Sequence, residues 1–208
     1  HCQQGEPREL DIPVEDMRKF VGYKASSEGH QRSADFFLLS YYLGGMNLID
    51  MVNYDFRGFK DKPILSYIRQ KTRNKKRGTR TIEFTIQPEA FPIIEKYMNP
   101  STGHILDVKP SKYHARLKYI DLCLDHIKER LHINHRLSFY SARKSFVQHG
   151  FELGIPLETL EYCIGQSMKA NRPIFNYLKI MRQHADTAIR QILDNLKETG
   201  DSHEPPET

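Results

Sequence analysis

Strand-like patterns occur in one stretch of the chain, between residues 64 and 86, and helical patterns precede and follow it. Two runs in this stretch, 64–71 and 80–86, are rich in β-branched and aromatic residues. The basic connection between them, 73–78, contains Gly78, which favours an antiparallel hairpin. We therefore expect a mainly α fold with a small antiparallel β-sheet, in the α+β class.

The helices are predicted from apolar residues at helical spacing. The first begins at Pro13 and places Val14, Met17, Phe20 and Val21 on one face. Further helices are predicted at 35–43, 47–52, 89–97, 113–131, 139–153, 157–164 and 173–197. The pair Gly44-Gly45 ends the strongly apolar helix 35–43, and the polar residues 25–32 predict a loop. We expect a linker at 1–11, one domain at 12–198 and a disordered acidic tail at 199–208.

Length and composition restrict the class of protein. A chain of 208 residues with 38% hydrophobic and 27% charged residues can bury a core without disulfides or metals. No apolar run approaches the roughly 18 residues that span a membrane, and no signal peptide opens the chain. Three cysteines without a Cys-x-x-Cys pair favour a reducing, cytoplasmic setting. The histidines are scattered without the spacing of metal ligands, so we expect no metal site.

Positive charge is concentrated in one segment. The net charge is +5, and residues 57–80 hold ten Lys or Arg and a single acid, Asp61. A basic segment held between two strands is suited to contact the phosphate backbone of DNA, with Lys75, Lys76 and Arg77 as the contact residues. The alternative is a solvated charged loop.

Three further segments carry candidate chemistry. On a strand, Arg69 and Lys71 share a face with Tyr67. A guanidinium grips two phosphate oxygens, and a neighbouring lysine can protonate a leaving oxygen. The alternative for this segment is a solvent-facing basic strand edge.

The second segment contains Tyr140 and Arg143, which neighbour each other on a helix. Because this helix is otherwise apolar, Arg143 must find an anion or a carboxylate, and a structural salt bridge is as good an interpretation as a phosphate. The third segment contains Tyr177, one turn into a helix that Pro173 can start. A phenol becomes a nucleophile when cations or a base lie nearby; the alternative is a half-buried tyrosine with a satisfied hydroxyl.

In this order, the segments resemble the catalytic domain of the tyrosine recombinase (phage-type integrase) family, especially its branch in Bacteroides phages and transposons. The resemblance covers about residues 8–196. Its motifs are FFLLSYYLGGMNLID (36–50), RQKT (69–72), LSFYSARKSF (137–146), CIGQS (163–167) and NYL (176–178). Each motif is weak alone, and five in the correct order are specific.

The resemblance implies that Tyr177 is the nucleophile, Arg143 the second catalytic arginine and Lys71 the general acid. The chain departs from the family at several positions. Gly44 stands at or beside the first arginine, Tyr140 and Gln166 replace two histidine-type positions, and Lys144 replaces another histidine. Tyr140 and Gln166 can still hydrogen-bond a phosphate. Our first candidate for the missing arginine is Arg69, and the second is Arg172.

The resemblance also implies the reaction and the partner. Tyr177 cuts and rejoins double-stranded DNA through a 3′-phosphotyrosine intermediate without metal or nucleotide cofactor. A core-binding domain is expected before residue 1, with a homo-tetramer on DNA at full length, a monomer as this fragment, and a bacterial cytoplasmic, nucleoid-associated location. Two alternatives are a catalytically impaired DNA-binding module of a mobile element and a type IB topoisomerase-like enzyme that relaxes DNA.

Overall fold

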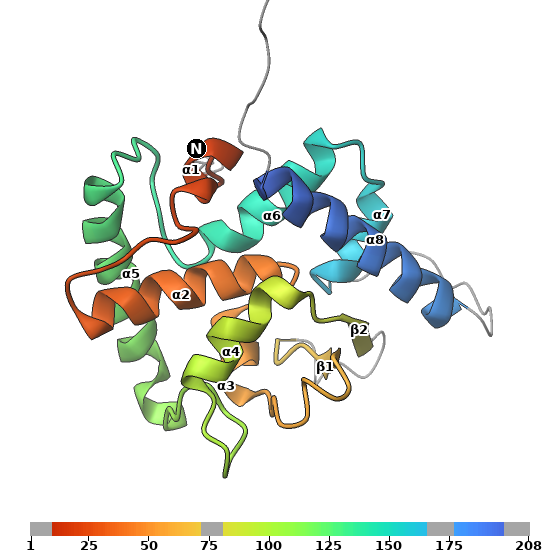
Figure 1. Cartoon of the computed structure of the whole chain (residues 1–208), viewed down its shortest axis with the longest axis horizontal. Coiled ribbons are helices and arrows are strands. Elements are labelled where there is room, and N and C mark those ends of the chain that lie inside the picture. Colours follow the sequence, from red (N-terminus) through yellow and green to blue (C-terminus); the bar gives the residue numbers. More distant parts are fainter. Residues whose placement is uncertain (1–9, 72–80, 166–176, 198–208) are drawn as a thin grey trace, which may run out of the picture.

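The computed structural model describes residues 10–71, 81–165 and 177–197, with the side chains of 177–180 excepted. The described chain is mainly helical and carries a two-stranded antiparallel sheet, which confirms the predicted α+β class (Figure 1). Its elements are α1 (Val14–Arg18), α2 (Glu28–Tyr42), α3 (Leu48–Asn53), β1 (Ile64–Ile68), β2 (Thr81–Thr85), the 3-10 turn η1 (Pro88–Ala90), α4 (Phe91–Tyr97), the 3-10 turn η2 (Pro110–Lys112), α5 (Tyr113–Arg130), α6 (Ser141–Glu152), α7 (Leu157–Cys163) and α8 (Tyr177–Lys197).

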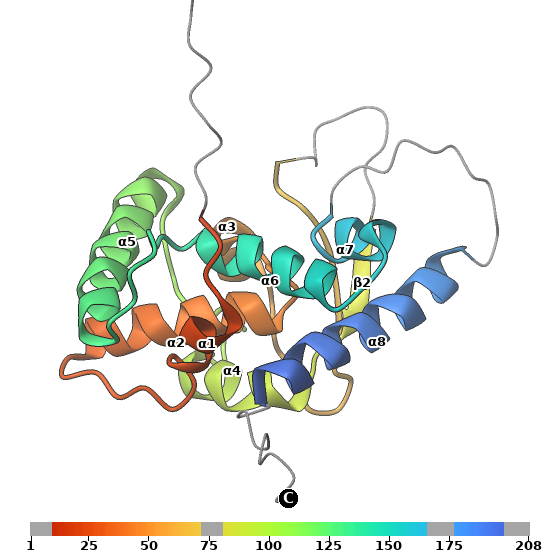
Figure 2. The same ribbon diagram turned by 90° about the horizontal axis from the view of Figure 1, so that it is seen from above.

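Helix α2 lies at the centre of the fold. Its second half is buried almost all round, and α4, α5 and α6 pack against it (Figures 1 and 2). The prediction of a loop at 25–32 is wrong, because α2 already begins at Glu28. The reason is a helix cap: the Ser27 hydroxyl accepts the backbone N–H of His30 at 3.3 Å. The pair Gly44-Gly45 ends the helix as predicted, and both residues have positive φ, 69° and 74°.

The first predicted helix is shorter than expected. Helix α1 ends at Arg18, whose guanidinium donates to the carbonyl oxygens of Asn195 and Leu196 at the end of α8. Met17 and Phe20 are buried as predicted, but Val21 is 49% exposed because the chain has left the helical path by that residue.

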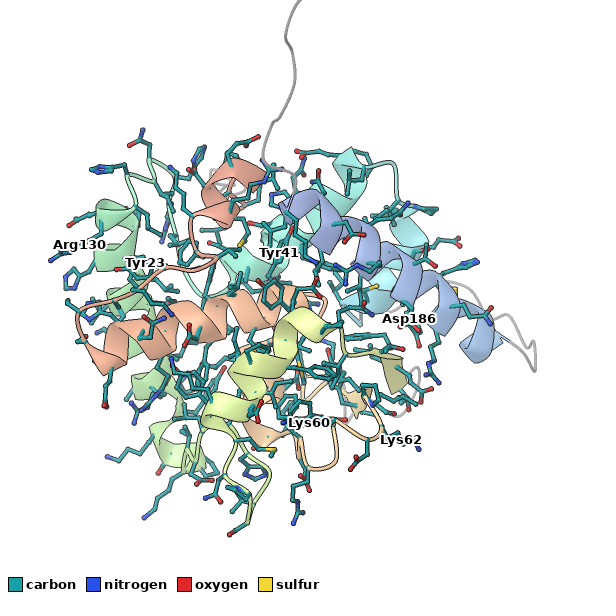
Figure 3. All side chains as sticks on the ribbon, in the orientation of Figure 1. Tyr23, Tyr41, Lys60, Lys62, Arg130 and Asp186 are labelled. Atoms are coloured by element: carbon teal, nitrogen blue, oxygen red, sulfur yellow. The ribbon has the colours of Figure 1, made fainter. Side chains whose placement is uncertain are left out.

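The sheet pairs Ile64 with Thr85 and Ile68 with Thr81. Leu65, Ile82 and Phe84 point into the core. Helix α8 packs across β2 and α7, and one of its carboxylates holds the sheet edge. Asp186, labelled in Figure 3, accepts the backbone N–H of Thr85 at 2.5 Å and the hydroxyl of Thr85 at 2.8 Å. The sheet is therefore fixed to the C-terminal helix by hydrogen bonds as well as by packing.

The remaining helices agree with prediction to within a few residues. Tyr140 lies just before α6 rather than inside it, and the predicted start of the last helix at 173–176 lies outside the described residues. The same holds for the 73–78 connection and for the tails at 1–9 and 199–208. In the described part of the chain, no helix has the length and hydropathy that crossing a bilayer requires.

Candidate functional site

Arg143 lies near the amino end of α6 and is 4% exposed. Its guanidinium donates to two backbone carbonyls, that of Gly45 at 3.1 Å and that of Ile164 at 2.5 Å. Among the described residues, Arg143 forms no ion pair with a carboxylate, so the structural salt bridge considered from the sequence is absent there. Besides the two carbonyls, the phenol of Tyr140 is a side-chain hydrogen-bond partner of Arg143.

Gly45 makes the approach of these elements possible. A Cβ atom at this position would lie 2.9 Å from Cα of Arg143, inside van der Waals contact. The sequence had indicated Gly45 only as a helix breaker. Its second role is to let α6 pass directly over the turn after α2, so that the guanidinium of Arg143 reaches the carbonyl of Gly45.

Arg69 lies beside Arg143. It follows β1 and donates from Nη1 to the carbonyl of Gly165 at 3.0 Å. The aliphatic part of the Arg69 side chain packs on Gly165. A Cβ atom added to Gly165 would lie 2.5 Å from Cδ of Arg69. The pKa of Arg143 is lowered, first by burial and next by the positive charge of Arg69. The structure thus brings together two guanidinium groups that donate to consecutive carbonyls at the end of α7.

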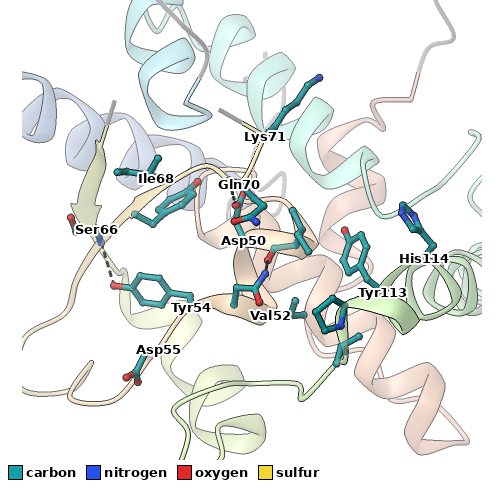
Figure 4. Close-up of a pocket in the computed structure, with 15 residues that line it drawn as sticks. Asp50, Val52, Tyr54, Asp55, Ser66, Ile68, Gln70, Lys71, Tyr113 and His114 are labelled. Atoms are coloured by element: carbon teal, nitrogen blue, oxygen red, sulfur yellow. Dashed lines mark hydrogen bonds between the residues drawn. The ribbon is translucent and has the colours of Figure 1, made fainter. Parts of the chain in front are cut away.

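Lys71 departs from the prediction. Strand β1 ends at Ile68, so Arg69 and Lys71 do not share a strand face. The physical reason is a long-range hydrogen bond: the backbone N–H of Gln70 donates to Asp50 at 2.8 Å instead of continuing the ladder (Figure 4). Lys71 is consequently exposed, and its side chain extends away from the residues around it.

Tyr67 and Asp50 complete the neighbourhood of the arginines. The hydroxyl oxygen of Tyr67 is buried and has no hydrogen-bond partner among the described groups. Burial and the nearby Asp50 raise the pKa of Tyr67, while Arg143 and Arg69 act in the opposite direction. Asp50 is 7% exposed. It was not predicted as a site residue, because nothing in the surrounding sequence distinguishes it from an ordinary helix residue.

Tyr140 and Lys144 lie at the surface of the same helix end. Tyr140 is 44% exposed, and its phenol group raises the pKa of Arg143. The ammonium of Lys144 is exposed and lies 5.8 Å from the centre of the Tyr140 ring. Both residues are therefore near Arg143 on the solvent side, and the predicted proximity of Tyr140 to Arg143 is found although Tyr140 precedes the helix.

The other predicted site residues lie outside what the structure describes. Tyr177 is the first residue of α8, but its side chain is among those excepted. The remaining ones are Gln166, Arg172, Lys75, Lys76 and Arg77. Their roles, and that of Tyr177, stay predictions.

A cavity of about 830 Å³ opens next to these residues (Figure 4). It lies between α3, the end of β1 and the start of α5, and Asp50, Tyr67 and Lys71 line one part of it.

Across the described ranges, no three His, Cys, Asp or Glu side chains form a group that could hold a metal ion. The two described cysteines are buried, and burial raises the pKa of Cys163 to about 12, so this thiol is not ionised near neutral pH.

The arrangement can bind an anion through two guanidinium groups, with a lysine at the edge of the adjacent cavity.

We compared the sequence with models of known protein families and with curated proteins, and neither comparison finds a match.

Proposed function

We propose that this chain is a catalytic domain of the tyrosine recombinase type, which cuts and rejoins DNA through a covalent phosphotyrosine. The proposal rests on the order of the five sequence motifs and on one structural observation. That observation is the adjacency of Arg69 and Arg143 at the end of α7.

Two neighbouring guanidinium groups repel each other; burial is the main cause of the lowered pKa of Arg143, and the positive charge of Arg69 lowers it further. Backbone carbonyls satisfy hydrogen bonds but bring no negative charge. A bound phosphodiester would supply the charge, because its non-bridging oxygens accept from the fork of N–H groups that each arginine presents. In the transition state these oxygens carry more charge, so the arginines would bind it more strongly than the ground state.

In the proposed reaction, the phenol oxygen of Tyr177 attacks the scissile phosphorus and loses its proton. The bond from phosphorus to the 5′-oxygen breaks, and Lys71 donates a proton to that oxygen. The products are a 3′-phosphotyrosine and a free 5′-hydroxyl. A 5′-hydroxyl from a second strand reverses the step, so the phosphodiester energy is conserved in the covalent intermediate. We assign Arg69 to the role of the arginine that Gly44 replaces.

A trapping experiment tests this function. The protein is incubated with nicked duplexes of randomised central sequence, from which the short cleaved strand diffuses away and prevents religation. A denaturation-resistant DNA–protein adduct is expected. Duplex binding without any adduct would reject the enzyme and favour the DNA-binding module.

A further inference from the structure

The amino end of α5 carries a second basic segment. Between Val108 and Ile120 there are four Lys or Arg and no Asp or Glu, namely Lys109, Lys112, Arg116 and Lys118. Lys109, Lys112 and Lys118 are exposed. The first turn of α5 contains no acidic residue. Positive side chains at a helix amino end are electrostatically unfavourable, so this placement calls for a negatively charged partner.

This segment forms one side of the cavity described above. Val108, Pro110, Tyr113 and His114 line that side, and Gln70 and Lys71 line the opposite side. Lys109 lies between the lining residues Val108 and Pro110 in the chain, and Lys112 directly precedes the lining residue Tyr113, so we take both exposed lysines as the rim of the cavity on this side. The cavity therefore has basic residues on both sides, and Figure 4 shows Lys71 and His114 at separate edges of it.

The positive charges at this rim are not neutralised by the described part of the protein. Elsewhere on the protein, lysines are paired with carboxylates, as Lys60 is with Glu95 at 2.6 Å and Lys96 with Asp35 at 2.8 Å. No such ion pair involves Lys71, Lys109 or Lys112 among the described residues.

The two acids of the cavity are already engaged by other groups. Asp55 forms an ion pair with Arg57 at 2.5 Å, which lowers the pKa of Asp55 to about 2. Asp50 accepts the backbone N–H of Gln70. Neither carboxylate lies in an ion pair with the rim lysines, so the rim keeps its positive charge.

We infer that this cavity and its rim, defined by Lys71, Lys109 and Lys112, bind a second stretch of the DNA sugar–phosphate backbone. The inference rests on the proposed function, since it places this stretch beside the phosphate held by Arg69 and Arg143. Lys109 and Lys112 contact phosphates, and the ring of Tyr113 in the cavity wall packs against sugar. Such contacts are independent of base sequence and release counterions from DNA.

The inference is tested by the salt dependence of duplex binding, measured for a random-sequence duplex by fluorescence anisotropy. The double variant Lys109→Ala/Lys112→Ala removes two phosphate contacts. Its log–log salt slope should be shallower than that of the unchanged protein by about 1.8, at about 0.9 per contact. Both side chains are exposed, so the fold is expected to persist.

The matched control is Lys128→Ala/Arg130→Ala, at the other end of the same helix. A rise of 1.5 Å per residue places Arg130 roughly 27 Å from Lys112, and Figure 3 shows Arg130 at the edge of the molecule away from α8. This pair should leave the slope unchanged. An unchanged slope in the Lys109/Lys112 variant, or an equal change in both pairs, overturns the inference.

The outcome is separable from that of the trapping experiment. If the unchanged protein forms the covalent adduct while the Lys109/Lys112 slope stays the same, the second backbone site is wrong and the proposed function stands. If the slope changes as expected while no adduct forms, the site is retained and the enzyme is rejected.

Discussion

At the scale of single residues, Arg143 and Arg69 are positioned by backbone carbonyls. The carbonyls of Gly45, Ile164 and Gly165 each accept one bond from these arginines. An arginine has five N–H donors in a rigid fork, so these bonds to fixed carbonyls orient each guanidinium. A carboxylate partner would instead neutralise the charge that a phosphate needs.

Arg69→Ala should lower cleavage of the nicked duplex by on the order of a hundredfold, the usual effect of losing a preorganised donor. Arg69→Lys should restore activity only in part, because an ammonium lacks the bidentate fork. Single-turnover cleavage rates measure both, with Lys62→Ala, an exposed lysine before β1, as the control. A rate within about threefold of the unchanged protein for Arg69→Ala, together with severe loss in Arg172→Ala, would transfer the role to Arg172.

Gly45 offers a stability prediction at the same scale. Gly45→Ala introduces a Cβ that meets Arg143 and also strains a positive φ, whereas Gly154→Ala strains a similar φ of 77° in open space. Gly154→Ala should reduce the free energy of unfolding by about 1 kcal/mol. Gly45→Ala should reduce it by about 1–3 kcal/mol more, owing to overpacking. Urea denaturation compares the two variants. Equal losses in the free energy of unfolding would show that the close packing of α6 on Gly45 does not add to the cost of the substitution.

At the scale of secondary-structure elements, α6 holds both the candidate site and the segment that precedes α1. The backbone N–H of Ile12 donates to the Ser145 hydroxyl at 3.0 Å, and the Ile12 carbonyl accepts from Nε2 of His149 at 2.7 Å. Because Nε2 is the donor, Nδ1 of neutral His149 accepts the hydroxyl of Tyr41 at 2.8 Å. The neutral imidazole therefore joins α2, α6 and the segment before α1.

Protonation of Nδ1 of His149 removes the acceptor of the hydrogen bond from the Tyr41 hydroxyl. Burial lowers the pKa of His149, and the weaker effects of the hydrogen bond to the Ile12 carbonyl and of the nearby Glu152, Asp11 and Glu15 oppose burial. The folded state thus binds fewer protons than the unfolded state, whose histidine pKa is about 6.5. Stability is complete above that pH and is lost as the pH falls, by up to about 1.4 kcal/mol per pH unit.

Urea denaturation between about pH 7.5 and about pH 5.5 tests this dependence. The unchanged protein should lose more stability over that interval than His149→Gln, which cannot titrate but can donate and accept hydrogen bonds. Every other ionisable group is common to both proteins and cancels from the comparison. The same pH dependence in both would refute a role for neutral His149.

The elements themselves were largely predictable, since each is set by local signals. The periodicity of α5, with buried Ile120, Leu124 and Ile127, gives its position to within one residue. The end of β1 was not predictable in this way, because it depends on Asp50, which lies 20 residues away and captures the N–H of Gln70. The start of α2 was missed although its cap, Ser27, is a local signal that the polar composition of 25–32 obscured.

At the scale of the whole molecule, the candidate site joins segments that are remote in sequence. The turn after α2, the end of β1, the start of α6 and the end of α7 meet at the two arginines. The sequence indicated Arg143 and Arg69 as candidate anion ligands, and only the family resemblance assigned both to one phosphate. Local patterns could not place them side by side, because their adjacency depends on glycines at 45 and 165 that allow backbone and side chain to approach closely.

The position of Lys71 was not predicted correctly from the sequence. Strand periodicity placed it on the face of Arg69, whereas the described chain exposes it at the cavity edge. A general acid at this position reaches the leaving oxygen only when DNA occupies the cavity beside it. The proposed site is therefore completed by its substrate.

The central claim is that Tyr177 forms a covalent bond with DNA, and peptide mapping of the trapped adduct tests it most directly. After nuclease and protease digestion, mass spectrometry should find the nucleotide remnant on Tyr177 through a 3′-phosphate. Tyr177→Phe should give no adduct and bind duplex DNA with nearly unchanged affinity, since the ring is kept and one hydroxyl is lost. An adduct on another residue, or one that persists in Tyr177→Phe, would contradict the account.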